Sequence, residues 1–281
     1  GVNHIGDWGT QFGKLTYEGL ELPEEVYGWF GGPKFGVEGL KERFGVKEFP
    51  MLVAIIKPSL GSGLSKDIVE QKISAALAGG FHAVKDDEMQ GDLRFVTLVD
   101  RISIAEKSGH YIPTLNLDSP EEYEKFISKE KIGMVLINAS TIGFPLLRAL
   151  REKTKIPILS HVAMQGVFNY SFSPKLFAFL HRLFGCDAFI TPIGDVDYYR
   201  ISKEGEMEMA EELTKELPIR KTLPLLTGGA RLHNLEQIIS LYEKKKVPYG
   251  VVFGTLIFVS EKEPKEMANM VVQKIKEFKN R

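Results

Sequence analysis

The chain of 281 residues has little cysteine and no long hydrophobic run. Its one cysteine, Cys186, cannot form a disulfide within the chain, which is typical of proteins from a reducing compartment. No stretch reaches the roughly 18 consecutive apolar residues that a membrane-spanning helix needs. The first residues also lack the charged and then apolar pattern of a secretion signal. The sequence therefore predicts a soluble, cytoplasmic protein that has no membrane partner.

An excess of charge of one sign is missing as well. The chain has 36 lysine and arginine residues against 37 aspartate and glutamate residues. Balanced charge provides no broad positive surface for nucleic acid, so we expect no nucleic-acid partner. A small, neutral or acidic substrate is the expected ligand.

Eight short apolar runs are present, and they predict eight strands. They cover residues 51–56, 80–84, 111–117, 133–138, 156–161, 187–193, 222–227 and 249–253. The runs do not alternate between apolar and polar residues. This pattern indicates parallel strands that are buried on both faces by covering helices.

Amphipathic segments with the period of a helix follow these runs. They cover residues 65–78, 93–107, 120–128, 144–153, 174–184, 202–217, 235–244 and 265–278. Ser65 and Ser119 are suitable N-cap residues for two of them. Eight strand–helix units of this length predict an α/β fold, a TIM (β/α)8 barrel over residues 51–281.

Residues 1–50 precede the predicted barrel and are interpreted as a connector. Residues 15–50 are rich in glycine and aromatic residues, which predicts an irregular segment leading to a short helix near residues 37–44. Residues 1–14 resemble a segment of arginyl-tRNA synthetases. Nothing later in the chain resembles the ATP-binding signatures of that family, so we assign no catalytic role to His4 or Asp7.

Active sites of TIM barrels lie where the strands end, so polar residues at these ends are the candidates. They are Lys57, residues 85–88, Asn116, Asn138, His161, Thr191, residues 227–229, Gly254 and Thr255. Asn116 among them is expected to bind the substrate. Taken singly, a histidine or an asparagine at such a position is as well explained by a structural hydrogen bond or a turn. Their convergence on one rim of one barrel favours an active site.

Lys85, Asp86, Asp87 and Glu88 follow each other at the end of the second run. Carboxylate oxygens are ligands that Mg2+ prefers. A lysine amine can condense with CO2 to a carbamate, which would add an anionic oxygen ligand to those of Asp87 and Glu88. The alternative is a solvated acidic turn after a strand.

Lys57 and two glycine-containing loops are the other candidates. Lys57 leaves an apolar wall, where desolvation would lower its pKa and suit it to proton transfer, or it is an ordinary surface lysine. Thr227, Gly228 and Gly229 follow the seventh run, and Gly254 and Thr255 the eighth. Loops at these positions commonly bind phosphate through backbone N–H groups.

Five segments together resemble the RuBisCO large-chain superfamily. They are residues 32–37 (GPKFGV), 56–61 (IKPSLG), 79–88 (GGFHAVKDDE), 160–164 (SHVAM) and 226–229 (LTGG). The resemblance implies that Lys85 is carbamylated by CO2 and binds Mg2+ with Asp87 and Glu88. It also implies that Lys57 transfers a proton and that His161 is an active-site histidine.

Several charged residues of the carboxylases in this superfamily are replaced here. Ser59 stands in place of a second lysine, and Val162 in place of an arginine. Residues 189–197 provide neither the histidine nor the loop lysine of the carboxylases. One phosphate site is left, and we expect an apolar wall on the other side of the rim, at Val162 and Ile190.

The pattern is closest to RuBisCO-like proteins, which include the enolase of methionine salvage. It implies a Mg2+-dependent enolase or isomerase that acts on a small keto-sugar or keto-thio-sugar monophosphate. Two alternatives stay open: a divergent ribulose-bisphosphate carboxylase, and a non-catalytic, truncated barrel that binds a metal or a ligand. Members of the superfamily have a whole N-terminal domain, and residues 1–50 of this sequence are interpreted as a short remnant of it. The superfamily is built on dimers, but most of the contact made by that domain is missing here, so we expect a weak homodimer.

Overall fold

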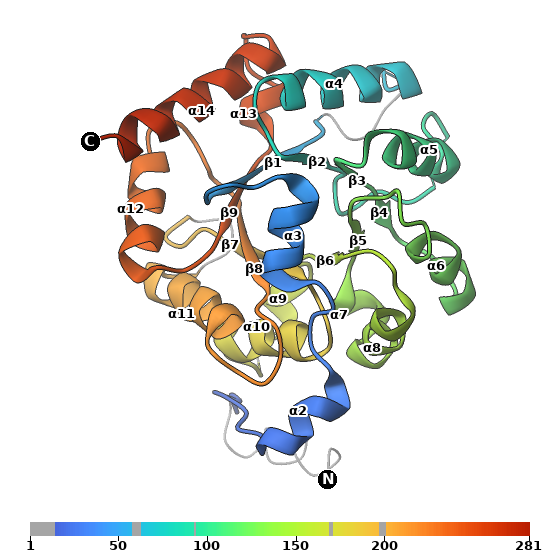
Figure 1. Ribbon diagram of the computed structural model, residues 1–281, viewed down its shortest axis with the longest axis vertical. Helices are drawn as coiled ribbons and strands as arrows, with labels where there is room; N and C mark the ends of the chain where they lie inside the picture. Colours follow the sequence, from blue (N-terminus) through green and yellow to red (C-terminus); the bar gives the residue numbers. More distant parts are fainter. Residues whose placement is uncertain (1–14, 58–62, 93, 169–170, 197–200) are drawn as a thin grey trace.

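Parallel strands form a nearly closed barrel in the computed structural model, which describes residues 15–57, 63–92, 94–168, 171–196 and 201–281 (Figure 1). The strands are β1 (Met51–Ile55), β2 (Ala83–Lys85), β3 (Tyr111–Ile112), β4 (Thr114–Leu115), β5 (Val135–Ile137), β6 (Ile158–Ser160), β7 (Ala188–Pro192), β8 (Leu223–Thr227) and β9 (Gly250–Phe253). Their order in the sheet is β3-β2-β1-β9-β8-β7-β6-β5-β4. The predicted α/β barrel is confirmed.

The predicted strand over residues 111–117 is wrong in one respect, because Pro113 divides it into β3 and β4. Proline has no N–H to donate to a neighbouring strand, so it interrupts the ladder. β3 pairs with β2, and β4 pairs with β5. The Pro113 carbonyl still accepts a hydrogen bond of 2.9 Å from the Leu136 N–H, so the chain continues across the break.

Helices surround the barrel, as the amphipathic segments predict. They are α4 (Lys66–Ala78), α5 (Leu98–Ser108), α6 (Pro120–Ile127), α8 (Phe144–Lys153), α10 (Pro174–Leu183), α11 (Lys203–Thr214), α12 (Leu235–Lys245) and α14 (Pro264–Lys279). Ser65 and Ser119 cap α4 and α6 by accepting backbone N–H hydrogen bonds, as expected. The start of the segment over residues 93–107 is corrected, because α5 begins at Leu98 with Thr97 as its N-cap.

Two helices lie within residues 15–50. The helix α3 (Gly36–Phe44) was expected, and its Val37, Leu40 and Phe44 pack against residues of β1 and other strands at the end of the barrel where the strands begin. The helix α2 (Glu24–Phe30) was not expected, and it packs against α10 outside the barrel. Val37, Leu40 and Phe44 of α3 therefore belong to the barrel core.

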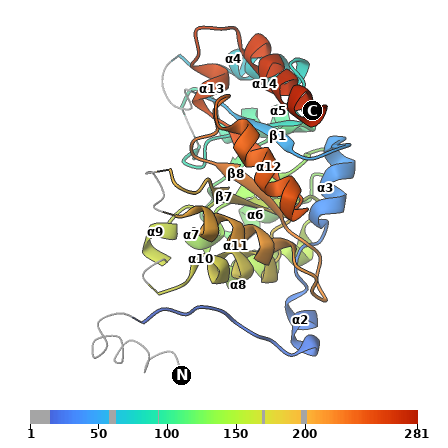
Figure 2. The same cartoon turned by 90° about the vertical axis from the view of Figure 1, so that its left-hand side faces the viewer.

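Three helices of one turn follow strands on the opposite rim. They are α7 (Ala139–Ile142), α9 (Gln165–Phe168) and α13 (Thr255–Phe258). Figure 2 shows α7 and α9 at the end of the barrel opposite to α3. No helix in the described ranges is long and apolar enough to cross a membrane. Cys186 is fully buried, and burial raises the pKa of its thiol far above the usual value.

Candidate active site

The turn after β2 is held in place by Asp86, whose carboxylate is buried. Asp86 Oδ2 lies 2.6 Å from Arg101 Nη1 and accepts a hydrogen bond of 3.0 Å from the Thr114 N–H. Asp86 Oδ1 accepts a hydrogen bond from the Tyr111 hydroxyl. A buried carboxylate needs such partners, because removing its charge from water is costly. Asp86 is therefore committed to structure, which leaves Asp87 and Glu88 for a ligand.

Lys85 ends β2 with its side chain fully buried at 0% exposure. Its Nζ donates to the Asp86 carbonyl at 2.6 Å and lies 3.5 Å from Glu88 Oε2. Burial lowers the pKa of the amine, although the carboxylates of Glu88, Asp87 and Asp86 act in the opposite direction. A lowered pKa increases the share of neutral amine, which is the form that reacts with CO2.

Asp87 faces the end of β1, where its Oδ2 forms an ion pair with Lys57 Nζ. Its Oδ1 accepts a hydrogen bond of 3.0 Å from the Met89 N–H. Burial opposes ionisation of Asp87, but the hydrogen bonds from Lys57 and Met89 outweigh it, so the pKa lies below its usual value. The Lys57 side chain is 31% exposed and ion-paired, so it does not stand isolated against an apolar wall as the sequence predicts.

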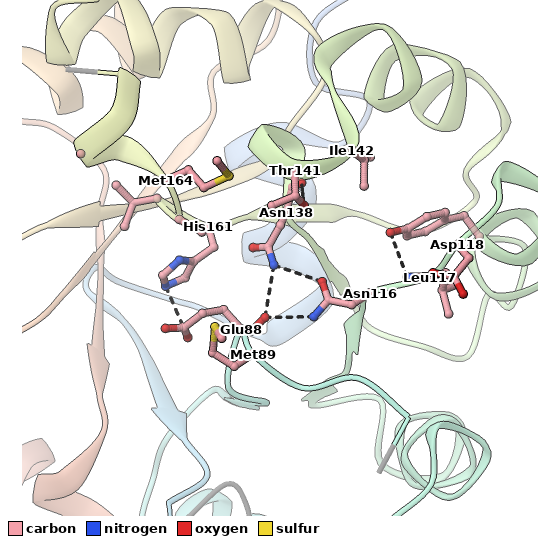
Figure 3. Close-up of a pocket in the computed structure, with 14 residues that line it drawn as sticks. Glu88, Met89, Asn116, Leu117, Asp118, Asn138, Thr141, Ile142, His161 and Met164 are labelled. Atoms are coloured by element: carbon pink, nitrogen blue, oxygen red, sulfur yellow. Dashed lines mark hydrogen bonds and ion pairs between the residues drawn. The ribbon is translucent and has the colours of Figure 1, made fainter. Parts of the chain in front are cut away.

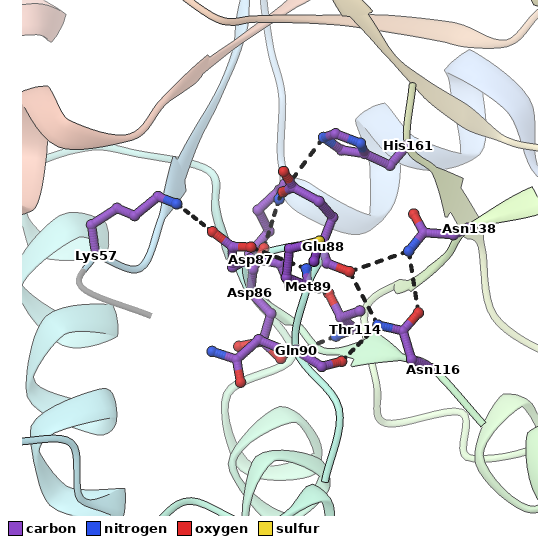
Figure 4. A network of polar contacts seen from close by, with 11 residues as sticks. Lys57, Asp86, Asp87, Glu88, Met89, Gln90, Thr114, Asn116, Asn138 and His161 are labelled. Carbon is purple, nitrogen blue, oxygen red and sulfur yellow. Dashed lines mark hydrogen bonds and ion pairs between the residues drawn. The ribbon is translucent and has the colours of Figure 1, made fainter. Parts of the chain in front are cut away.

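His161 lies on the other side of Glu88, just after β6. Its Nε2 is 3.5 Å from Glu88 Oε2. Burial lowers the pKa of His161 to about 4, in spite of the nearby Glu88 carboxylate, so the ring is neutral at pH 7. Its Nδ1 is buried and has no hydrogen-bond partner within the described ranges. Figure 4 shows Lys57, Asp87, Glu88 and His161 arranged across the rim.

Two asparagines fix the backbone of this turn. The Nδ2 atoms of Asn116 and Asn138 donate to the Glu88 carbonyl at 3.1 and 3.2 Å. Asn138 Nδ2 also donates to Asn116 Oδ1 at 3.2 Å, and Asn116 Nδ2 to the Gln90 carbonyl at 2.8 Å. Asn116, expected to bind substrate, therefore positions Glu88 in this structure, and it also lines the adjoining cavity.

A cavity of about 740 Å³ opens beside Glu88 and His161 (Figure 3). Its apolar walls include Leu117, Ile142 and Val162, as expected for Val162. The expectation for Ile190 is wrong, because this side chain is fully buried in the barrel core. The residues with a described place in the cavity wall include no lysine or arginine, and two of them, Glu88 and Asp118, are acidic.

A smaller cavity of about 360 Å³ lies on the other side, at the ends of β1, β8 and β9. Lys57 lines it together with all five residues predicted to bind phosphate: Thr227, Gly228, Gly229, Gly254 and Thr255. Gly228 and Gly229 have φ angles of 82° and 137°, which glycine adopts readily and other residues do not. The structure thus brings the predicted phosphate residues together beside the predicted proton-transfer lysine.

The metal prediction depends on the state of Lys85. Among the described residues, no group of three histidine, cysteine, aspartate or glutamate side chains could hold a metal ion. Asp87 and Glu88 supply two carboxylates, and the third oxygen ligand has to come from Lys85 as a carbamate. The buried amine 3.5 Å from Glu88 suits that modification, so the residues fit Mg2+ with a carbamate.

Two arginines of this region were not predicted from the sequence to belong to the site. Arg101 lies on the apolar side of α5, next to the buried Leu98, Ile102 and Ala105, and a charge at such a position is a signal of a buried partner. Arg231 lines the smaller cavity two residues after Gly229. Ser59 falls outside the described residues, so its replacement of a lysine has no structural counterpart here.

The fold resembles that of RuBisCO-like proteins of known structure. No protein-family model matches the chain. The crystal structure of a rubisco-like protein (MtnW) from Alicyclobacillus acidocaldarius superposes with a TM-score of 0.79 and 25% identity, over 94% of this chain and 69% of that one.

Two curated relatives are similar to the chain in sequence. The chain is 32% identical to a 2,3-diketo-5-methylthiopentyl-1-phosphate enolase from Geobacillus thermodenitrificans, over 78% of this chain and 59% of the relative. It is 28% identical to a ribulose bisphosphate carboxylase-like protein from Chlorobaculum tepidum, over 90% of this chain and 61% of the relative. The chain is therefore related to the RuBisCO-like proteins and spans about three fifths of these two relatives. The likeness of residues 1–14 to a synthetase finds no support among them.

Proposed function

We propose that the protein is a RuBisCO-like enzyme that enolises or isomerises a keto-sugar or keto-thio-sugar monophosphate. The observation that carries the proposal is the pair of cavities on either side of the Lys57–Asp87 and Glu88–His161 contacts. The smaller cavity suits one phosphate, and the larger one has apolar walls for an uncharged tail. The enolase relative acts on a substrate with this division of groups, according to its name.

Lys85 as a carbamate, Asp87 and Glu88 would hold Mg2+ in this enzyme. The bound cation would polarise the carbonyl oxygen of the substrate as a Lewis acid. The protein positions these ligands through the Asp86–Arg101 ion pair and through the hydrogen bonds from Asn116 and Asn138 to the Glu88 carbonyl.

Lys57 is the proposed proton carrier. Its Nζ atom lies between the smaller cavity and Asp87, so a ketone whose phosphate occupies that cavity has its reacting carbons near Lys57. Lys57 would take the proton as the neutral amine, and the ammonium formed in this way would return it. His161 is neutral at pH 7 and presents an imidazole to the larger cavity. It can orient a substrate oxygen there without adding charge.

Carboxylation of ribulose bisphosphate is the less favoured alternative. A second phosphate would have to enter the larger cavity, where the described lining residues supply two carboxylates and no cation. Burying an uncompensated phosphate beside carboxylates and hydrocarbon costs several kcal/mol. A ligand-binding barrel without catalysis is the other alternative, and the following experiment separates all three.

The test is solvent-deuterium incorporation into 2,3-diketo-5-methylthiopentyl 1-phosphate and into a five-carbon keto-sugar 1-phosphate. We expect exchange that requires Mg2+ and bicarbonate and is abolished in Lys85→Ala. Lys107→Ala, which changes an exposed lysine on α5, is the control and should exchange normally. Radiolabelled CO2 fixed onto ribulose bisphosphate in a Lys85-dependent manner would restore the carboxylase, and absence of any exchange would leave the ligand-binding barrel.

A further inference from the structure

We infer that Arg231 is the charged ligand of the substrate phosphate and makes the smaller cavity selective for a dianion. The inference rests on the proposed function, since it names a group for the phosphate of the same substrate. It adds a cation to a site whose other predicted phosphate ligands are uncharged glycine and threonine residues.

Arg231 is placed at the smaller cavity by the loop after β8. Its side chain is exposed and lines that cavity with Gly228 and Gly229. Its Nη1 donates to the neighbouring Ala230 carbonyl at 3.0 Å. A guanidinium group has five N–H donors, so most of them are left for a ligand. Among the described residues, no carboxylate lies within 4.0 Å of the guanidinium nitrogens.

The charge balance of the cavity depends on this side chain. Lys57 is the other cation in the described part of its lining, but Lys57 is already paired with Asp87. The described lining residues include no carboxylate of their own. While Asp87 holds Lys57, as it does in this structure, Arg231 supplies the positive charge that is left over for an anion.

Asn234 holds the loop that carries Arg231. Its Oδ1 accepts a hydrogen bond of 2.9 Å from the Arg231 N–H, and its Nδ2 donates to the Gly229 carbonyl at 2.9 Å. Both polar ends of one side chain therefore fix the backbone on either side of Ala230. Fixing the loop before the ligand arrives lowers the entropy cost of binding.

The chemistry of arginine fits a phosphate monoester. Its planar fork can donate two parallel hydrogen bonds to two phosphate oxygens, and it keeps its charge at any physiological pH. A monoester carries nearly two negative charges at neutral pH, whereas a carboxylate carries one. Removing Arg231 should therefore weaken binding of phosphate more than binding of a carboxylate.

The test uses inorganic phosphate as the probe, with acetate for comparison, and titration calorimetry without Mg2+ or bicarbonate. We expect Arg231→Ala to raise the Kd for phosphate about tenfold or more, since hydrogen bonds to charged groups are the stronger class. Arg231→Lys keeps the positive charge but not the two parallel donors, so its Kd for phosphate should rise less than that of Arg231→Ala. Arg220→Ala is the matched control, because Arg220 is an exposed arginine before the other end of β8.

The assignment is overturned by absence of phosphate binding to the wild-type protein, by an unchanged Kd in Arg231→Ala, or by an equal loss in Arg220→Ala. Thermal unfolding of each variant shows that it is folded. Failure of the proposed function has a different signature. In that case phosphate binds and depends on Arg231, yet no keto-phosphate exchanges its proton.

Discussion

Arg101 of α5 and Asp86 of the turn after β2 form a buried ion pair, with Nη1 and Oδ2 2.6 Å apart and side chains only 2% and 3% exposed. The same guanidinium donates to the Thr114 carbonyl at 2.9 Å and to the Gly91 carbonyl at 2.6 Å. Arg101 therefore ties a helix, β4 and the turn that carries the candidate metal ligands together.

Replacing Arg101 by Met should strongly destabilise the protein, because it leaves the Asp86 carboxylate buried without its partner. Loss of one member of a buried pair typically costs about 3–5 kcal/mol. Chemical denaturation measures the free energy of unfolding. Lys107→Ala breaks an exposed pair with Glu70 and should cost under about 1 kcal/mol. Equal effects of the two substitutions would contradict the structural role of Arg101.

Mg2+ binding should require both CO2 and Lys85. Lys85→Ala should abolish the CO2-dependent part of Mg2+ binding, and Lys85→Arg should fail as well, because guanidinium forms no carbamate under these conditions. The neutral amine is the reactive form, so carbamylation should increase with pH, and burial lowers the pKa at which it levels off. Magnesium titrations with and without bicarbonate measure this. The carbamate proposal is wrong if the affinity for Mg2+ is the same with and without bicarbonate and the same in Lys85→Ala as in the wild type.

Removing the Asn138 side-chain amide should lower the affinity for Mg2+, although Asn138 is not itself a proposed ligand. Asn138→Ala takes away the hydrogen bond to the Glu88 carbonyl. Groups that orient metal ligands typically contribute about 10- to 100-fold to metal affinity. We expect a loss of this size in the magnesium titration with bicarbonate present. Ile142→Val, at the wall of the same cavity, is the control and should retain the wild-type affinity.

His181 should make the protein sensitive to acid. Its Nδ1 donates to the Phe177 carbonyl at 2.8 Å, and its ring stacks on Phe189. Burial lowers its pKa to about 3, although the Phe177 hydrogen bond acts in the opposite direction. The unfolded chain, with a pKa near 6.5, binds the proton first as the pH falls. The stabilisation is therefore complete above about pH 6.5 and is lost toward pH 3, by on the order of 4 kcal/mol.

The measurement is the free energy of unfolding of His181→Gln and of the wild type between pH 7 and the acid limit of folding. The variant has no imidazole to protonate, so its stability should fall less steeply than that of the wild type. His233→Gln changes an exposed histidine and should leave the slope unchanged. Parallel curves for His181→Gln and the wild type would refute the assignment.

The sequence predicts most of the barrel because buried parallel strands are continuous apolar runs, and each of the eight runs overlaps a strand. The division at Pro113 was not predicted. The sequence shows that Pro113 has no N–H, but only the structure shows that the chain changes its neighbouring strand there, from β2 to β5. The helix α2 was missed because residues 15–50 contain many glycines, and its stability comes from packing against Phe179 and Leu183. Tertiary contacts of this kind override local patterns.

The site residues were predictable where a strand end fixes their position. Lys57, Asp87 and His161 all reach one rim, as the barrel requires. The partner of Asp86 comes from a helix 15 residues away, a contact that no local pattern specifies. Roles of these residues in catalysis, the division at residue 50, the homodimer and the cytoplasmic location stay predictions.

The break in the sheet at Pro113 has a consequence for hydrogen exchange. Beyond Ile112, the Thr114 N–H bonds to the Asp86 carboxylate in place of a strand, and the Thr114 hydroxyl donates to the Asp87 carbonyl at 2.9 Å. The same two hydrogen bonds of Thr114 therefore bridge the break between β3 and β4 and hold the turn of Asp86 and Asp87. Amide hydrogens of Thr114 and Met89 should accordingly exchange with deuterated solvent as one cooperative unit, and ligands that hold the turn should slow both equally.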